Sequence, residues 1–219
     1  MKLKLSAIAA LFVAFGTIFF YAPVEAQQGI VQKIFYVHVA CAMTMYVGFA
    51  TAFVSSLLYL ADRREKYDEI AVSGAEVGFF FCTIVLSTGL VWAKPIWGAW
   101  WTWDPRLTTT LLVWLLYASY LVLRGYLRDS PRKGTVSAIV AIIAALDIPL
   151  LHFSVRIWRG MHPTVVSGQG GGISPAMKLT LLVTLGAMLL LFAALFSLRL
   201  RLERSRNHLA RIQLERQEV

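Results

Sequence analysis

Six long apolar runs constrain the fold of this 219-residue chain more than any other feature. Each is close to the ~20 residues that an α-helix, rising about 1.5 Å per residue, needs to cross the hydrocarbon layer of a membrane. Backbone groups in lipid must be hydrogen-bonded within their own segment, and these runs are too long and too evenly apolar for barrel strands. The sequence therefore predicts an all-α integral membrane protein, a bundle of six transmembrane helices: Leu5–Tyr21, Ile34–Leu60, Ile70–Trp92, Thr108–Leu127, Val136–Phe153 and Lys178–Leu198.

The composition and the organisation of the chain agree with this class. Hydrophobic residues make up 58% of the chain and charged residues 15%, which is outside the range of a soluble domain. No internal repeat or soluble domain separates the runs, so residues 1–219 are interpreted as a single transmembrane domain with a basic tail over 199–219. A cleaved signal peptide ending before Gln27 is the alternative for the amino end. The first apolar run is longer than the usual core of about 7–15 residues, which favours a retained helix.

The distribution of positive charge predicts the orientation in the membrane. Of the 21 Lys and Arg residues, 15 lie at the amino end, in the loops after the second and fourth helices, and in the tail. The other three loops and their borders hold only 6. The positive-inside rule then places both termini in the cytoplasm and the first, third and fifth loops outside. The net charge of +9 is thus explained by topology, and we expect no nucleic-acid partner.

The third loop, an outer one, contains an unusual concentration of tryptophan. Within "WGAWWTWDPRLT", four indoles occupy seven positions, at Trp97, Trp100, Trp101 and Trp103. If this loop forms a short interfacial helix, three of them share one face with Asp104 at i, i+3, i+4 and i+7 spacing. Indoles also gather at the membrane interface for reasons of amphipathy alone. Four in so short a loop instead favour a platform for a large, planar, apolar ligand.

Asp104 and Pro105 open the fourth apolar run. Asp is a preferred N-cap residue, because its carboxylate accepts hydrogen bonds from backbone N–H groups that the helix leaves without partners. Proline at the first helical position loses nothing by lacking an N–H group. We therefore expect Asp104 to cap this helix, with direct contact to a ligand as the alternative.

Two histidines lie on the same predicted side of the membrane as the tryptophans. His38 begins the second helix and His162 lies in the fifth loop. Either one alone is more often a structural residue than a metal ligand, but a pair flanking an aromatic platform suits haem, whose iron takes axial imidazoles. His152 is a rival for the second position, with closing of its helix end or second-sphere hydrogen bonding as its structural role. His208 lies in the inner tail, which excludes it.

The remaining polar residues leave their roles open. The haem propionates would need cations, and Arg106, Arg156 and Arg159, with Lys94, are on the correct side, although lipid headgroups attract the same residues. Glu76 and Asp147 lie within apolar runs, where carboxylates are costly and commonly functional, and neither has a basic partner near it in sequence. The remaining candidates, Cys41 and Cys82, are interpreted as small buried residues.

Three stretches of the sequence resemble a known family. The stretches "QQGIVQKIFYVHV", "WAKPIWGAWWTWDPRLT" and "DIPLLHFSVRIWRGMHP" are similar to the WWD-motif membrane proteins that handle haem during cytochrome c maturation, and among these to the CcmC family. The resemblance covers nearly the whole chain. It implies a multi-pass protein of the bacterial inner (cytoplasmic) membrane with the WWD motif in its second periplasmic loop.

The resemblance also implies ligands and partners. Haem b would be bound as cargo by bis-histidine ligation through His38 and His162, against Trp97, Trp100, Trp101, Trp103 and Asp104. The family delivers haem to the periplasmic chaperone CcmE and works with CcmD and with the ATP-binding-cassette pair CcmA and CcmB. The chain itself has no nucleotide-binding motif. Hence we expect a haem-binding and transfer component within membrane lipid, not an enzyme, and any ATP hydrolysis belongs to a partner.

Two other classes of function compete with haem transfer. A b-type cytochrome that carries electrons would bury its His ligands between facing helices nearer the bilayer centre, and it would not need an exposed tryptophan loop. A solute transporter could use Glu76 and Asp147 in its pathway, but the chain lacks paired broken helices and an inverted repeat.

Overall fold

The computed structural model describes residues 2–128, 130–158 and 173–217, and this part of the chain is almost entirely helical. Six of its helical segments are long and apolar enough to cross a membrane. The prediction of a six-helix membrane bundle is therefore confirmed, and the chain is a multi-pass membrane protein. The elements in chain order are α1 (Lys2–Gly16), the π-helical turn Thr17–Tyr21, the 3-10 turn Ile30–Lys33, α2 (Ile34–Asp62), α3 (Glu65–Trp97), α4 (Pro105–Tyr126), α5 (Lys133–Ala145), α6 (Asp147–Trp158) and α7 (Pro175–Gln217).

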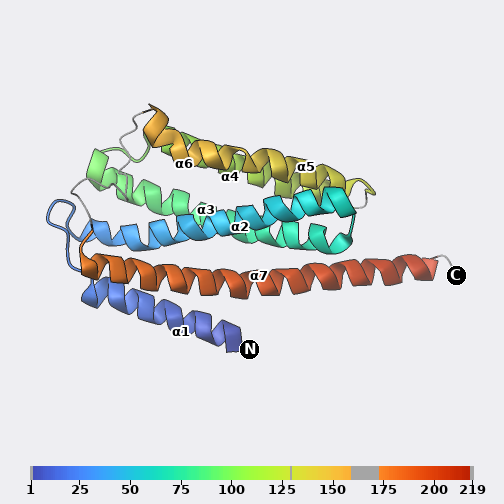
Figure 1. The fold of residues 1–219 in the computed structure, drawn as a ribbon, viewed down its shortest axis with the longest axis horizontal. Helices are drawn as coiled ribbons and strands as arrows, with labels where there is room; N and C mark the ends of the chain where they lie inside the picture. The colour runs from blue at the N-terminus through green and yellow to red at the C-terminus, as the bar shows by residue number, and fades with distance from the viewer. Residues whose placement is uncertain (1, 129, 159–172, 218–219) are drawn as a thin grey trace.

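The helices are arranged in layers around a central antiparallel pair. α2 and α3 pack along their length and form the middle of the bundle (Figure 1). α7 lies against both of them and carries α1 on its other side, whereas α4, α5 and α6 cover the opposite side of the pair. The connection between α3 and α4, which contains the tryptophans, lies at the same end of the bundle as the start of α2 (Figure 1).

Glycines allow α2 and α3 to approach closely. A Cβ atom on Gly48 would lie 2.6 Å from Cα of Gly78, and one on Gly74 would lie 2.9 Å from the carbonyl oxygen of Gly48. Lipid tails are as apolar as the helices, so association within a membrane depends on van der Waals packing between backbones that small residues bring together. Gly74 and Gly78 form the small-xxx-small spacing typical of such contacts. This contact sets the separation of the two central helices.

Two of the predicted helices differ from their expected form. The fifth apolar run is divided into α5 and α6 at Leu146, because Pro149 has no N–H group to donate and its ring would clash with the carbonyl of Ala145. The sixth predicted helix is longer than expected, since α7 continues as one 43-residue helix to Gln217 and includes most of the residues predicted as the basic tail.

Ion pairs hold the second half of α7 to α3, and they supply a partner that sequence reasoning did not find for Glu76. Its carboxylate is bonded to the guanidinium of Arg199 on α7. Nearby, the buried Arg124 of α4 donates two hydrogen bonds to Asp68, of 2.7 and 2.6 Å, and lies 3.4 Å from Glu203. Buried charges are tolerated when they are paired in this way. Glu76 and its neighbours thus join α3, α4 and α7.

We predict that Gly48→Ala destabilises the bundle. The added methyl group would meet the backbone of α3 at 2.6 Å, and overpacking of this kind costs roughly 1–3 kcal/mol. Thermal denaturation of the detergent-purified protein, followed by loss of the monodisperse species, measures the effect. Gly186→Ala is the matched control, because a Cβ atom there meets no atom within 4 Å. Equal melting temperatures for the two variants would contradict the close contact.

Candidate functional site

A cavity of about 470 Å³ lies between the helices beside the tryptophan connection, because Trp97 and Trp101 are among its lining residues. Its walls come from α2, α3, α4, α6 and α7, and most of its lining is apolar. Ligand sites in proteins have volumes of about 300–1,000 Å³, with apolar walls and a few polar groups that orient the ligand. The polar and aromatic groups that matter here are His38, Tyr46, Trp92, Trp97, Trp101, Arg106 and His152.

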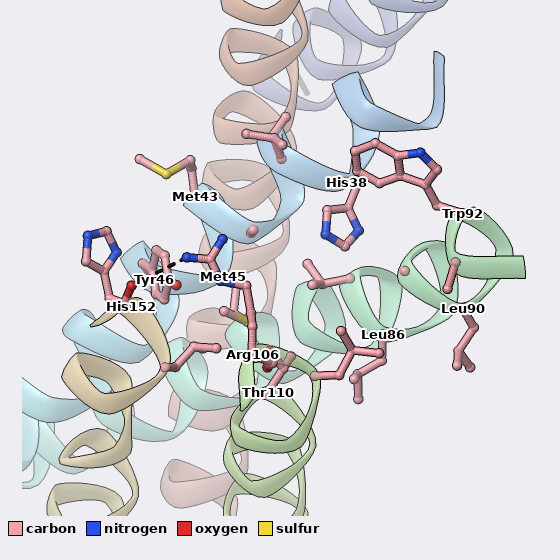
Figure 2. Close-up of a pocket in the computed structure, with 18 of the residues that line it drawn as sticks. His38, Met43, Met45, Tyr46, Leu86, Leu90, Trp92, Arg106, Thr110 and His152 are labelled. Carbon is pink, nitrogen blue, oxygen red and sulfur yellow. Dashed lines mark hydrogen bonds between the residues drawn. The ribbon is translucent and has the colours of Figure 1, made fainter. Parts of the chain in front are cut away.

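His38 enters this cavity from the beginning of α2. The side chain is buried, at 8% exposure, although it lies only one turn from the start of the helix at Ile34. Its Nδ1 atom is 2.9 Å from the hydroxyl oxygen of Thr88 on α3. In Figure 2 the ring lies beside Trp92 and on the opposite side of Arg106 from His152. The structure therefore places the first predicted iron ligand in the wall of an apolar cavity.

Trp92 forms a wall beside His38 that the sequence analysis treated only as the end of a helix. The two rings meet edge to face, with centroids 5.8 Å apart and planes at 70°. The indole N–H of Trp92 donates to the side-chain oxygen of Gln28 at 3.1 Å, which ties the segment before α2 to the end of α3. Phe35 makes a second edge contact with Trp92 at 6.2 Å.

The tryptophan stretch does not form the short helix considered from its spacing. α3 ends at Trp97, because Gly98 adopts a left-handed conformation with φ of 75°, and the residues from there to Asp104 are not helical. Trp97 and Trp101 line the cavity, whereas Trp100 and Trp103 are 58% and 77% exposed and do not. The prediction that Trp97, Trp100 and Trp101 share one helical face with Asp104 is therefore wrong. The stretch instead divides into two inward and two outward indoles.

Asp104 caps α4, as predicted. Its carboxylate accepts a hydrogen bond from the backbone N–H of Arg106 at 2.9 Å, and Pro105 occupies the first helical position. The residue is 6% exposed. The cap fixes where α4 begins, and with it the place of Arg106, the second residue of α4, which lines the cavity.

Arg106 is the cation that the structure brings to the cavity. Figure 2 shows its guanidinium between His38 and His152, close to Tyr46. One of its nitrogens donates to the main-chain oxygen of His152 at 3.4 Å. Within the described part of the chain, no carboxylate lies within ion-pair distance of this guanidinium. A positive charge in an apolar cavity, without a carboxylate beside it, favours a ligand that carries an anionic group.

His152 lines the same cavity from α6. Because α6 continues to Trp158, His152 does not close a helix end, which rules out one of its two structural interpretations. Its ring has edge contacts with Tyr46 and Phe153.

The other predicted site residues are His162, Arg159 and Arg156. His162 and Arg159 lie outside the described residues, as does the side chain of Arg156. Cys41 and Cys82 are free and buried, in agreement with their interpretation.

The ligand chemistry of the cavity suits a cofactor that brings most of its own metal ligands. In residues 2–128, 130–158 and 173–217, no three His, Cys, Asp or Glu side chains gather as they would around a bare metal ion. A porphyrin supplies four nitrogens to its iron and requires only axial ligands from protein. The imidazoles of His38 and His152, the indole rings and a guanidinium match such a group. Another indication is the indole N–H of Trp101, which is buried and has no acceptor among the described residues.

Sequence reasoning missed Thr88, Gly89 and Trp92, because these residues are ordinary members of an apolar run. Their common feature is i, i+1 and i+4 spacing near the end of α3, which places them on neighbouring positions of one helix face. That spacing becomes informative only once α3 is known to run antiparallel beside α2.

Asp147 at the start of α6 is buried, and one of its carboxylate oxygens has no partner in the described part of the chain.

Comparison with known proteins identifies close similarity over almost the full length. The family described as heme exporter protein C, CcmC, matches residues 1–215. "Heme exporter protein C" of Escherichia coli (strain K12) is 32% identical over 199 residues, covering 91% of this chain and 81% of the relative. The protein of the same name in Bradyrhizobium diazoefficiens is 32% identical, with 88% and 74% covered. A "putative cytochrome c biosynthesis ccmC-like mitochondrial protein" of Arabidopsis thaliana is 34% identical, with 83% and 69% covered.

We predict that Asp104→Ala lowers stability by about 1 kcal/mol, within a range of 0.5–2, through loss of the helix cap. Asp104→Asn should retain most of this stability, because asparagine caps equally well without a charge. Thermal denaturation of the two purified variants beside the parent measures the difference. If the Asn variant is as unstable as the Ala variant, the charge matters for another reason and capping is not the main role.

Proposed function

The chain belongs to the CcmC family, and from that premise we propose that it binds haem in the cavity and delivers it to the periplasmic chaperone CcmE. The observation that carries this proposal is the convergence on a single apolar cavity of one buried imidazole, two inward indoles and a guanidinium that has no carboxylate partner among the described residues. Relatives are named for haem export, and this function requires a site that holds a large planar group with acidic substituents.

In this proposal, different residues bind the iron, the porphyrin ring and the propionates of the haem. His38 supplies one axial imidazole, and His162 supplies the second from the connection between α6 and α7. Trp97 and Trp101 pack against the porphyrin from inside the cavity, with Trp92 behind His38. Arg106 pairs with a propionate, and Arg156 and Arg159 are further candidates for the same role. Asp104 acts through the start of α4.

The outward indoles belong to the transfer step. Trp100 and Trp103 are exposed at the end of the bundle that the charge distribution places in the periplasm. Aromatic residues are enriched where protein surfaces bind partners. We infer that they contact CcmE when it takes the haem. In this arrangement the protein is a component of the bacterial inner membrane that works with CcmD, CcmA and CcmB, and ATP hydrolysis by the partner pair drives release.

The alternative function, a b-type cytochrome subunit, would take His152 as the second ligand. One observation favours it, namely that His152 lines the same cavity as His38. The position of His38 only one turn inside α2 supports haem transfer instead, because it keeps the iron near the membrane surface. The two functions therefore predict different second ligands.

We predict that His38→Ala and His162→Ala each lose or alter bound haem, whereas His152→Ala retains it. The measurement is the absorption spectrum, with total haem quantified, of detergent-purified protein co-expressed with CcmE. Removal of one axial imidazole should shift the Soret and α/β bands or abolish haem retention. Unchanged haem in both of the first two variants would overturn the ligand pair, and loss in His152→Ala alone would favour the cytochrome.

We predict that Arg106 gives the site its preference for free propionates. The parent should bind haem more tightly than haem dimethyl ester, and Arg106→Gln should reduce this preference by roughly 10–100-fold, the effect of losing one charge-assisted hydrogen bond. Titration of both porphyrins into apo-protein measures the ratio. Lys94→Gln is the matched control, since Lys94 is exposed, bonded to the carbonyl of Gly98, and outside the cavity. An unchanged ratio in Arg106→Gln would exclude a propionate contact.

A further inference from the structure

The hydroxyl group of Thr88 is placed to determine how His38 presents its nitrogens. This hydroxyl has one hydrogen. Its oxygen lies 2.7 Å from the carbonyl oxygen of Ile84 and 3.2 Å from that of Val85, the preceding turn of α3. On the other side it lies 2.9 Å from Nδ1 of His38. When the hydrogen is donated to the preceding turn, a lone pair of the oxygen is left to accept from Nδ1–H.

Donation of the Thr88 hydrogen to the preceding turn is compatible only with the tautomer of His38 that carries its hydrogen on Nδ1. With Nδ1 protonated, Nε2 carries the lone pair that a metal ligand needs. Metal-binding histidines commonly donate their second N–H to an oxygen, which fixes the tautomer and ring rotation and makes the imidazole a stronger donor. A hydroxyl is a neutral acceptor, so it strengthens the imidazole less than a carboxylate would.

The same helix also shapes the space around the ring. A Cβ atom on Gly89 would lie 3.4 Å from Cε1 of His38, which is ordinary van der Waals distance, so this position of α3 lies directly beside the imidazole. Trp92, one turn further along, contacts the ring edge to face at 5.8 Å. On α3, Thr88 therefore contacts His38 by a hydrogen bond and Trp92 by its ring, and Gly89 lies beside the imidazole.

The glycine contact between α2 and α3 explains why Thr88 is level with His38. Gly48 meets Gly78 where the two antiparallel helices touch. His38 is ten residues before Gly48 and Thr88 is ten residues after Gly78, so both lie roughly 15 Å along the pair toward the same end.

We propose that Thr88 is a positioning residue for haem binding, which accepts the Nδ1–H of His38 and so holds Nε2 ready for the iron. The inference rests on the proposed function, because it requires His38 to be an axial ligand. It adds a second layer to the site, on α3, outside the tryptophan motif.

The first test is haem titration with hydroxyl variants at Thr88. Thr88→Val keeps the shape and removes the hydroxyl, and we expect haem affinity to fall about 10–100-fold, the usual effect of deleting a second-sphere partner. The midpoint potential of the bound haem should rise, since a weaker imidazole donor stabilises ferric iron less. Thr88→Ser should restore both values. Ser87→Ala is the matched control, because its hydroxyl donates to the carbonyl of Thr83, one turn back on the same helix.

A second test uses the protein without haem. In apo-protein with ¹⁵N-labelled histidine, the nitrogen shifts of His38 should show protonated Nδ1 and unprotonated Nε2 in the parent and in Thr88→Ser, and a mixture in Thr88→Val. A parent with protonated Nε2 would overturn the inference, as would a Thr88→Val variant with parental affinity and potential.

The two tests separate failure of this inference from failure of the proposed function. If the parent binds no haem, or if His38→Ala binds it unchanged, the proposed function fails, and the positioning role fails with it. If His38→Ala loses haem but Thr88→Val behaves like the parent, only the positioning role is overturned.

Discussion

The close contact between α2 and α3 is the constraint on which the rest of the structure depends. Inside a membrane, burial of apolar surface does not drive helices together, so their association relies on backbones that can touch. Gly48 and Gly78 provide that contact, and the neighbouring ring of Phe49 then stacks on Tyr117 of α4 with centroids 3.8 Å apart. α4 to α6 are thereby packed on one side of the pair and α7 on the other. The cavity occupies the end of this arrangement where five helices meet around His38.

The buried ion pair between Arg124 and Asp68 lies away from the cavity, near the start of α3. Arg124, Asp68 and Glu203 are buried together, and the pairing of Glu76 with Arg199 continues this contact along α7. A carboxylate within an apolar run can indicate a transport pathway, but here Glu76 already has a cation from α7. This pairing weakens the solute-transporter interpretation. It also explains why the basic tail continues as a helix, since α7 must extend far enough to reach the acidic start of α3.

The candidate site shows which features a local sequence pattern can predict and which it cannot. Asp104 could be assigned as a cap because capping involves only neighbouring residues, and its hydrogen bond to the N–H of Arg106 has that form. The division of the indoles could not be predicted, because it depends on Gly98 ending α3 and on which side of the chain then faces the cavity. Thr88 could not be found either, since its partner His38 is 50 residues away and only the helix pair brings them together.

The sequence by itself determined the class of the protein. Apolar length specified six membrane helices, the placement of Lys and Arg predicted their orientation, and the tryptophan motif identified the family, because these signals are properties of local segments. Only the tertiary structure decided which of the predicted functional residues lie close together. It brought His38, Trp101 and Arg106 to one cavity, left Trp100 and Trp103 exposed, and paired Glu76 with α7. The physical reason is that such meetings depend on helix separation and register, which arise from contacts between residues far apart in the chain.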